Sequence, residues 1–74
     1  MAMKWHKKLE QLRLQRGEKQ ELVADALGIS QSTYCAWETG KVSPKLEQFE
    51  AVLTHFDVTL EEFALWQPST PGSA

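Results

Sequence analysis

Cysteine and histidine are scarce in the sequence, which has 74 residues but only one cysteine and two histidines. A tetrahedral metal site needs four ligands, and His6 and His55 stand far apart in the chain. Cys35 has no second cysteine with which to form an internal disulfide. We therefore expect neither a metal site nor a disulfide, and we expect no cofactor.

Long apolar runs are missing as well. The longest covers only a few residues, so no segment is predicted to span a bilayer. The first ten residues, MAMKWHKKLE, lack the apolar stretch of a signal peptide, and we expect a cytoplasmic protein. At 74 residues and 42% hydrophobic content, the chain has room for one small domain with a thin core.

Basic residues are absent after Lys45. Residues 1–45 contain all eight Lys and Arg against five acids, a balance of +3, whereas residues 46–74 contain five acids and no base, a balance of -5. The net charge of -2 therefore averages two different segments. A basic segment indicates a polyanionic partner. The alternative is that the split arose by chance.

Apolar residues recur at helical spacing, and no strand pattern interrupts them. Gly17 and Gly28 suit a left-handed helix stop, and Ser30 is a good N-cap. The sequence predicts five helices: one that carries Trp5, Leu9 and Leu12, one from Gln20 to Gly28, one from Gln31 to Glu38, one that carries Leu46 to Phe56 and stops at Asp57, and one that begins with the capping box of Thr59 and Glu62. We therefore expect an all-α domain over residues 1–66 and a disordered tail over residues 67–74, where Pro, Gly, Ser and Thr dominate.

The second and third predicted helices are separated by a short turn that contains Gly28, which is the spacing of a helix-turn-helix motif. On the third helix, Tyr34 and Trp37 are three residues apart and must share the face turned to the core. The residues turned outward are then Gln31, Ser32, Cys35 and Ala36. Such a short, uncharged face can enter the major groove of DNA, where a glutamine can bond both N6 and N7 of adenine.

A family resemblance rests on these residues. The run QELVADALGISQSTYCAWETGKVSPKLEQFEAVLTHFDVTLEEF resembles the phage-repressor and Cro-like helix-turn-helix family, and the likeness covers about Leu9 to Phe63. It implies a compact five-helix domain of the lambda-repressor type whose third helix reads the major groove. It also implies a two-fold dimer on a pseudo-palindromic operator.

The resemblance and the outward faces together assign candidate site residues. Base contacts are expected from Gln31, Ser32, Cys35 and Ala36. Phosphate contacts are expected from Arg16, Lys19, Gln20, Thr33, Lys41 and Lys45. Glu38 matches a structural acid that pairs with an arginine of the first helix in the family, and Arg13 stands at the matching place.

Lysines occupy two predicted helix starts at which the family usually has serine or threonine. Lys19 precedes the second helix and Lys45 the fourth, so each cation stands at the positive end of a helix dipole. This placement is favourable if DNA phosphates lie opposite. The alternative is that Glu18 and Ser43 cap these helices and that both lysines are merely solvated.

The predicted fourth and fifth helices carry more apolar side chains than one thin core needs, and such a surplus often marks an interface. The few cations of one subunit would support only weak DNA binding. We therefore expect a homodimer with Phe63, Leu65 and Trp66 at the seam. The alternative for Trp66 is a role in closing the core over the fifth helix.

The predicted function is sequence-specific binding of double-stranded DNA by a transcriptional regulator, a repressor that acts as a dimer. The alternative is a protein-interaction or antitoxin-type module that keeps the fold and binds DNA weakly. The acidic second half and the short side chain of Ala36 favour that alternative. An enzyme is not predicted, because no Ser, Cys or Lys stands at motif spacing from His6 or His55.

Overall fold

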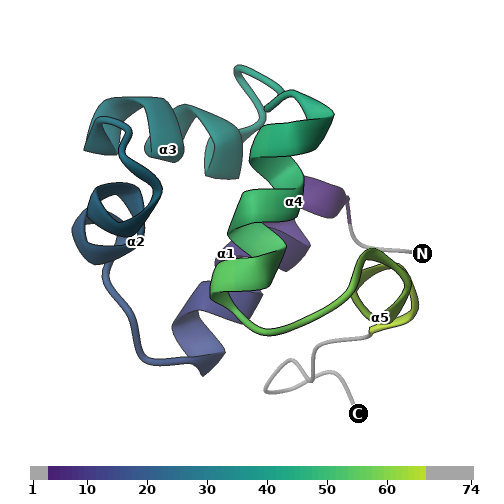
Figure 1. Ribbon diagram of the computed structural model, residues 1–74. Helices are drawn as coiled ribbons and strands as arrows, with labels where there is room; N and C mark the ends of the chain where they lie inside the picture. Colours follow the sequence, from purple (N-terminus) through teal and green to yellow (C-terminus); the bar gives the residue numbers. More distant parts are fainter. Residues whose placement is uncertain (1–3, 67–74) are drawn as a thin grey trace, which may run out of the picture.

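The computed structural model describes residues 4–66, which form five α-helices and no β-strand. The helices are α1 (Trp5–Gln15), α2 (Gln20–Leu27), α3 (Gln31–Thr39), α4 (Leu46–His55) and α5 (Leu60–Leu65). Figure 1 shows α2 and α3 on one side of α4, and α5 on the other side. The predicted all-α class with five helices is confirmed, whereas the predicted tail lies outside the described residues. None of the helices in this range is long and apolar enough to cross a membrane.

The turns after the helices of the motif depend on backbone conformations with positive φ. α2 and α3 end at Gly28 with φ 71° and at Gly40 with φ 82°, a conformation that glycine adopts without steric cost. Gly40 is constrained further, since an added Cβ would lie 3.0 Å from the ring of His6. Asp57 follows α4 with φ 59°, a left-handed conformation that aspartate adopts more readily than most residues, and the helix ends there as the sequence predicts.

Ser30 and Thr59 cap their helices as the sequence predicts. The Ser30 hydroxyl accepts a hydrogen bond from the Thr33 N–H at the start of α3. At the start of α5, the Thr59 hydroxyl accepts from the Glu62 N–H at 3.0 Å, and the Glu62 carboxylate accepts from the Thr59 N–H at 2.8 Å. This reciprocal pair satisfies two backbone donors that would otherwise lack a partner inside the helix.

Lys19 and Lys45 are the N-cap residues of α2 and α4, and neither side chain caps its helix. A lysine ammonium has no acceptor to offer to the free N–H groups of a first turn. At α4, the side-chain oxygen of Gln48 accepts a hydrogen bond from the Lys45 N–H at 2.8 Å. The alternative in which Glu18 and Ser43 are the caps is therefore wrong, because the chain enters each helix one or two residues later.

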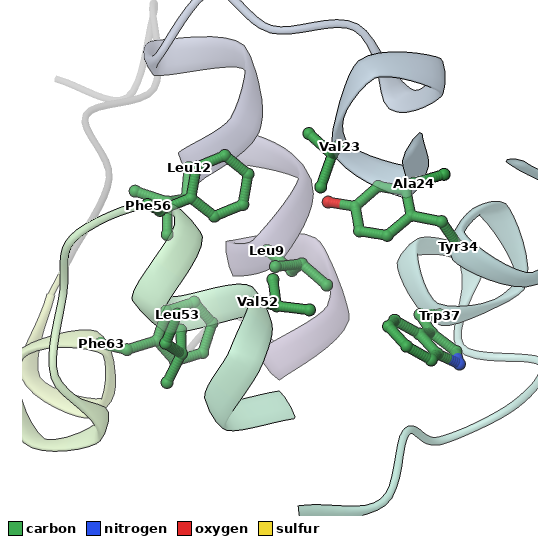
Figure 2. Close-up of a cluster of buried hydrophobic side chains, with 10 residues drawn as sticks. All are labelled: Leu9, Leu12, Val23, Ala24, Tyr34, Trp37, Val52, Leu53, Phe56 and Phe63. Atoms are coloured by element: carbon green, nitrogen blue, oxygen red, sulfur yellow. The ribbon is translucent and has the colours of Figure 1, made fainter. Parts of the chain in front are cut away.

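Ten buried apolar side chains, shown in Figure 2, form one core beneath all five helices. They are Leu9 and Leu12 of α1, Val23 and Ala24 of α2, Tyr34 and Trp37 of α3, Val52 and Leu53 of α4, Phe56 after α4, and Phe63 of α5. Tyr34 and Trp37 point into this core, and their burial turns the opposite face of α3 to the surface. Trp5 and Trp66 are half-buried and pack against the edge of the core.

Lys8 fastens α5 to α1 through contacts that the sequence pattern does not predict. Its Nζ donates a hydrogen bond to the Ala64 carbonyl at 2.9 Å and lies 5.4 Å from the centre of the Phe63 ring. A cation near the last carbonyls of a helix complements the dipole of that helix, and the ring face attracts the cation as well. Lys8 is consequently buried, so its charge is used within the domain and does not add to the basic surface.

Candidate nucleic-acid interface

The outward face of α3 carries small or uncharged side chains. Gln31, Ser32 and Thr33 are exposed in the first turn, whereas Cys35 and Ala36 are half-buried further along the helix. The two recessed side chains are short, so they allow a surface to approach α3 closely. The longest reach on this face therefore belongs to the Gln31 carboxamide, which has both donor and acceptor groups.

Three hydroxyl groups converge at the start of α3. The Ser30 Oγ lies 2.8 Å from the Thr33 Oγ1 and 3.2 Å from the Ser32 Oγ. Together with the Thr33 N–H, these contacts use the full hydrogen-bonding capacity of the Ser30 hydroxyl, whereas the Ser32 and Thr33 hydroxyls keep capacity for further partners. The structure thus brings the predicted base contacts Gln31 and Ser32 next to the predicted phosphate contact Thr33.

Four exposed cations stand before α2 and after α3, the two helices of the motif. They are Arg16, Lys19, Lys41 and Lys45, and among residues 4–66 none of them lies within ion-pair distance of a carboxylate. Lys19 and Lys45 stand at helix starts, where free N–H groups and the helix dipole favour an anion. Lys41 lies in the loop between α3 and α4. Figure 1 shows this loop at the end of α3. These cations are free to neutralise charges outside the domain.

A buried ion pair holds the motif against α1. Arg13 Nε donates to Glu38 Oε2 at 2.7 Å, and Arg13 Nη2 donates to Glu38 Oε1 at 3.1 Å. The hydrogen bond to Glu38 raises the pKa of Arg13, so the guanidinium remains charged. The structure therefore brings together the two residues that the family resemblance pairs.

Gln20 is held by the same carboxylate. Its Nε2 donates a hydrogen bond to Glu38 Oε1 at 2.9 Å, so the start of α2 is tied to the end of α3. A carboxamide nitrogen carries two hydrogens, and one of them remains available for an external acceptor. The contact between Gln20 and a phosphate stays a prediction, with the orientation of the side chain set by Glu38.

Tyr34 adds a polar atom to the core beside this network. Its hydroxyl is buried and has no hydrogen-bond partner among the described residues. Burial raises the pKa of Tyr34 above its usual value near 10, and the negative charge of Glu38 raises it further. The Tyr34 phenol is therefore neutral in the folded domain.

Alkaline titration should show no tyrosinate absorbance until the domain unfolds. Because the folded pKa of Tyr34 exceeds the unfolded pKa, the neutral phenol contributes stability that is fully present below about pH 10 and is lost as the pH rises above it. The chain has one tyrosine and three tryptophans, and indole does not ionise in this pH range, so the rise in near-ultraviolet absorbance on ionisation reports on Tyr34 alone. Ionisation near pH 10 while circular dichroism still shows a folded helical domain would contradict this prediction.

Two ties to Glu18 were not predicted from the sequence. The His55 Nε2 lies 2.9 Å from Glu18 Oε1, and Arg13 Nη1 donates to the Glu18 backbone carbonyl at 2.9 Å. His55 is the last residue of α4, whereas Glu18 lies between α1 and α2. The separation of 37 positions between Glu18 and His55 leaves no signal in the helical periodicity.

Potential metal ligands lie apart. Cys35 is a free thiol on α3, and the His6 ring packs edge-on against Trp5 with 5.6 Å between ring centres. His55 is engaged by Glu18. In the described part of the chain, no three His, Cys, Asp or Glu side chains are grouped so that they could hold a metal ion.

The predicted dimer seam divides into a buried part and an exposed part. Phe63 is only 4% exposed because it packs in the core, Leu65 is 73% exposed, and Trp66 is half-buried. Beside them lies an open apolar hollow of about 640 Å³. It is lined by Trp5, Lys8, Ser43, Pro44, Leu46, Phe49, Leu60, Phe63 and Ala64. The seam stays a prediction in which Leu65 and Trp66 offer surface and Phe63 supports them from within.

Comparisons with known proteins agree with this geometry. The cryptic phage CTXphi transcriptional repressor RstR of Vibrio cholerae is 40% identical over 55 residues, which cover 74% of this chain and 50% of the relative. The transcriptional activator BcrR of Enterococcus faecalis is 35% identical over 60 residues, which cover 81% of this chain and 29% of the relative. The transcriptional regulator AnsR of Bacillus subtilis is 36% identical over 55 residues, which cover 74% of this chain and 47% of the relative.

The chain therefore spans half the length, or less, of each of these relatives. Residues 9–63, most of the chain, match the family described as helix-turn-helix. The matched segment contains α2, α3 and the turn at Gly28, and it coincides with the segment that resembles phage repressors. The chain belongs to the helix-turn-helix family.

Proposed function

We propose that the protein binds double-stranded DNA through α3 and regulates transcription, as a repressor that acts as a two-fold dimer on a pseudo-palindromic operator. The observation that carries this proposal is the exposed, uncharged start of α3 in a motif with four exposed cations, two before α2 and two after α3, that pair with no carboxylate among the described residues. The names of RstR, BcrR and AnsR support the proposal, because each describes a transcriptional regulator.

Gln31 is the main base reader in this proposal. A glutamine carboxamide can donate a hydrogen bond to adenine N7 and accept one from the adenine N6 amino group at the same time. Adenine is therefore its best match in the major groove. Ser32 has a shorter reach, and Ala36 can contribute only a methyl contact, for example to thymine. The expected specificity is therefore modest and concentrated on one base pair in each half-site.

The number of cations explains why two subunits are needed. Four cations near phosphates would release only about four counterions per subunit, which supports weak binding. A two-fold dimer doubles the number of phosphate contacts and places two α3 helices about one DNA turn apart. The acidic surface after Lys45 would face away from the DNA.

Selection of bound duplexes from genomic fragments by the purified protein tests the proposal. We expect an inverted repeat whose half-site centres lie about one helical turn apart, and affinity that falls as salt rises. A scrambled duplex of equal length is the control for sequence preference. Absence of binding to any duplex at low salt would overturn the proposal and would favour a protein-interaction module with the apolar hollow as its contact surface.

Lys41→Ala and Lys45→Ala should weaken binding to all duplexes to a similar extent. Each lysine is exposed and contacts phosphate in the proposal, so each substitution should lower the slope of log affinity against log salt by about one per occupied site. Lys7→Ala, which removes an exposed lysine from α1, is the matched control and should leave the slope unchanged. If the slopes of Lys41→Ala and Lys45→Ala equal that of the wild-type protein, phosphate contacts at these two lysines are excluded.

Leu65→Ser should shift the protein toward monomer in sedimentation equilibrium. Leu65 is 73% exposed at the end of α5, so the substitution removes apolar surface from the seam without opening the core. Trp66→Ala should act in the same direction. Leu22→Ser, at an exposed leucine of α2, is the control that should keep the wild-type mass. A wild-type protein that stays monomeric at high concentration would contradict the dimer.

A further inference from the structure

α2 begins without a side-chain cap, although Glu18 stands directly before its N-cap residue. Lys19 is the N-cap, and its carbonyl accepts hydrogen bonds from the N–H groups of Leu22 and Val23 at 3.1 and 3.2 Å. The N–H groups of Gln20 and Glu21 come earlier in the first turn, where a helix has no internal acceptors. An anion at this end would gain both their hydrogen bonds and the favourable field of the helix dipole.

Glu21 is an exposed acid within the first turn of α2, and Glu18 is the acid that precedes the N-cap. The structure directs the Glu18 carboxylate away from this helix start. This carboxylate lies 2.9 Å from the Nε2 of His55, the last residue of α4. The two side chains are only 23% and 30% exposed, so solvent and salt screen their contact less than a pair at the open surface. The Glu18 backbone is also fixed, because its carbonyl accepts from Arg13 Nη1 and its N–H donates to the Arg13 carbonyl.

A released Glu18 carboxylate would act against DNA in two ways. It could accept from the N–H groups of the first turn of α2, as acidic side chains at helix starts do. It would also place a negative charge beside Lys19, where a phosphate is expected. We propose that His55 is a positioning residue that holds Glu18 away from the start of α2 and so keeps this end open for a DNA phosphate. The inference rests on the proposed function.

His55→Phe tests this role, because phenylalanine keeps an aromatic ring against Phe56 but has no ring nitrogen to hold Glu18. Affinity for the selected operator should fall by about threefold to tenfold, the range expected when one helix-end interaction is lost. Glu18→Gln in the same chain should restore binding, because the competing charge is gone. His55→Gln should bind more tightly than His55→Phe, since a carboxamide can still donate to Glu18.

Glu50→Gln is the matched control, since it removes one exposed acid from α4 and has the same effect on net charge. Combined with His55→Phe, it should not restore binding. Equal rescue by Glu50→Gln would reduce the effect to net charge, and failure of Glu18→Gln to rescue would show that His55 acts only on the fold. Wild-type affinity in His55→Phe would overturn the proposal directly.

Amide hydrogen exchange in the free protein gives a readout that does not depend on DNA. In His55→Phe, exchange at Gln20 and Glu21 should slow, because the released carboxylate accepts their N–H groups, and Glu18→Gln should reverse this change. Unaltered or faster exchange at these two amides would overturn the positioning role even if the protein binds DNA. A wild-type protein that binds no duplex would overturn the proposed function, while slowed exchange would still show that His55 restrains Glu18.

Discussion

Glu38→Ala should destabilise the domain by about 3 to 5 kcal/mol, because it leaves the Arg13 guanidinium buried without a counter-charge. Arg13 is 8% exposed and Glu38 is 2% exposed, so water cannot replace the lost partner without opening the core. Gln20 loses its acceptor in the same variant. A loss of this size approaches the total stability of about 5 kcal/mol found at the lower end for small domains, and urea unfolding followed by circular dichroism should show a largely unfolded population.

Replacing both partners should cost less than replacing one. Arg13→Met combined with Glu38→Leu removes both charges and fills the space with apolar atoms, which is often nearly neutral for a buried pair. Glu50→Ala, at an exposed acid, is the control for loss of a carboxylate and should stay within about 0.5 kcal/mol of wild type. The double-mutant cycle also needs the single variants Arg13→Met and Glu38→Leu, and a coupling energy below about 0.5 kcal/mol in that cycle would show that the pair does not hold the helices together.

Gln31→Ala should weaken binding to the selected operator by about 1 to 3 kcal/mol and remove the preference at one base pair in each half-site. Gln31 is exposed at the first position of α3, so the substitution should leave the unfolding free energy almost unchanged. Competition binding with operators changed at single positions measures the effect. The prediction rests on α3 entering the major groove by its first turn.

Ser32→Ala is the neighbouring control, since it removes a shorter side chain from the same turn and should have a smaller effect on base preference. Binding of both variants to a scrambled duplex should match that of the wild-type protein. If Gln31→Ala instead weakened every duplex equally, Gln31 would contact the DNA backbone. Unchanged preference at every position would assign base reading to another surface.

The sequence by itself determined the helices and the orientation of α3. Tyr34 and Trp37 are three residues apart, so helical geometry alone places them on one face and turns Gln31 to the other. The positive φ at Gly28 and Asp57 follows from the limited conformations of the backbone at a helix end. These features depend on interactions within a few residues, which is why a pattern in the sequence is enough to predict them.

The pairing of Arg13 with Glu38 came from the family resemblance, because no local rule joins residues 25 positions apart. The sequence also suggested Glu18 as a cap for α2, whereas the structure has Lys19 at the N-cap and Glu18 against His55. Whether the Glu18 carboxylate contacts a helix start or a distant imidazole depends on which of them the folded chain brings within hydrogen-bonding distance. The local helix propensity of the sequence cannot predict which of these two contacts forms.

Only the tertiary structure decided which charged and apolar side chains remain available at the surface. Lys8 looks like one more cation of a basic segment, but the packing of α5 on α1 places the Ala64 carbonyl and the Phe63 ring beside it. The same packing buries Phe63 and leaves Leu65 at the surface. These outcomes depend on where helices distant in the sequence meet, since burial and long-range hydrogen bonds arise only when the helices pack together.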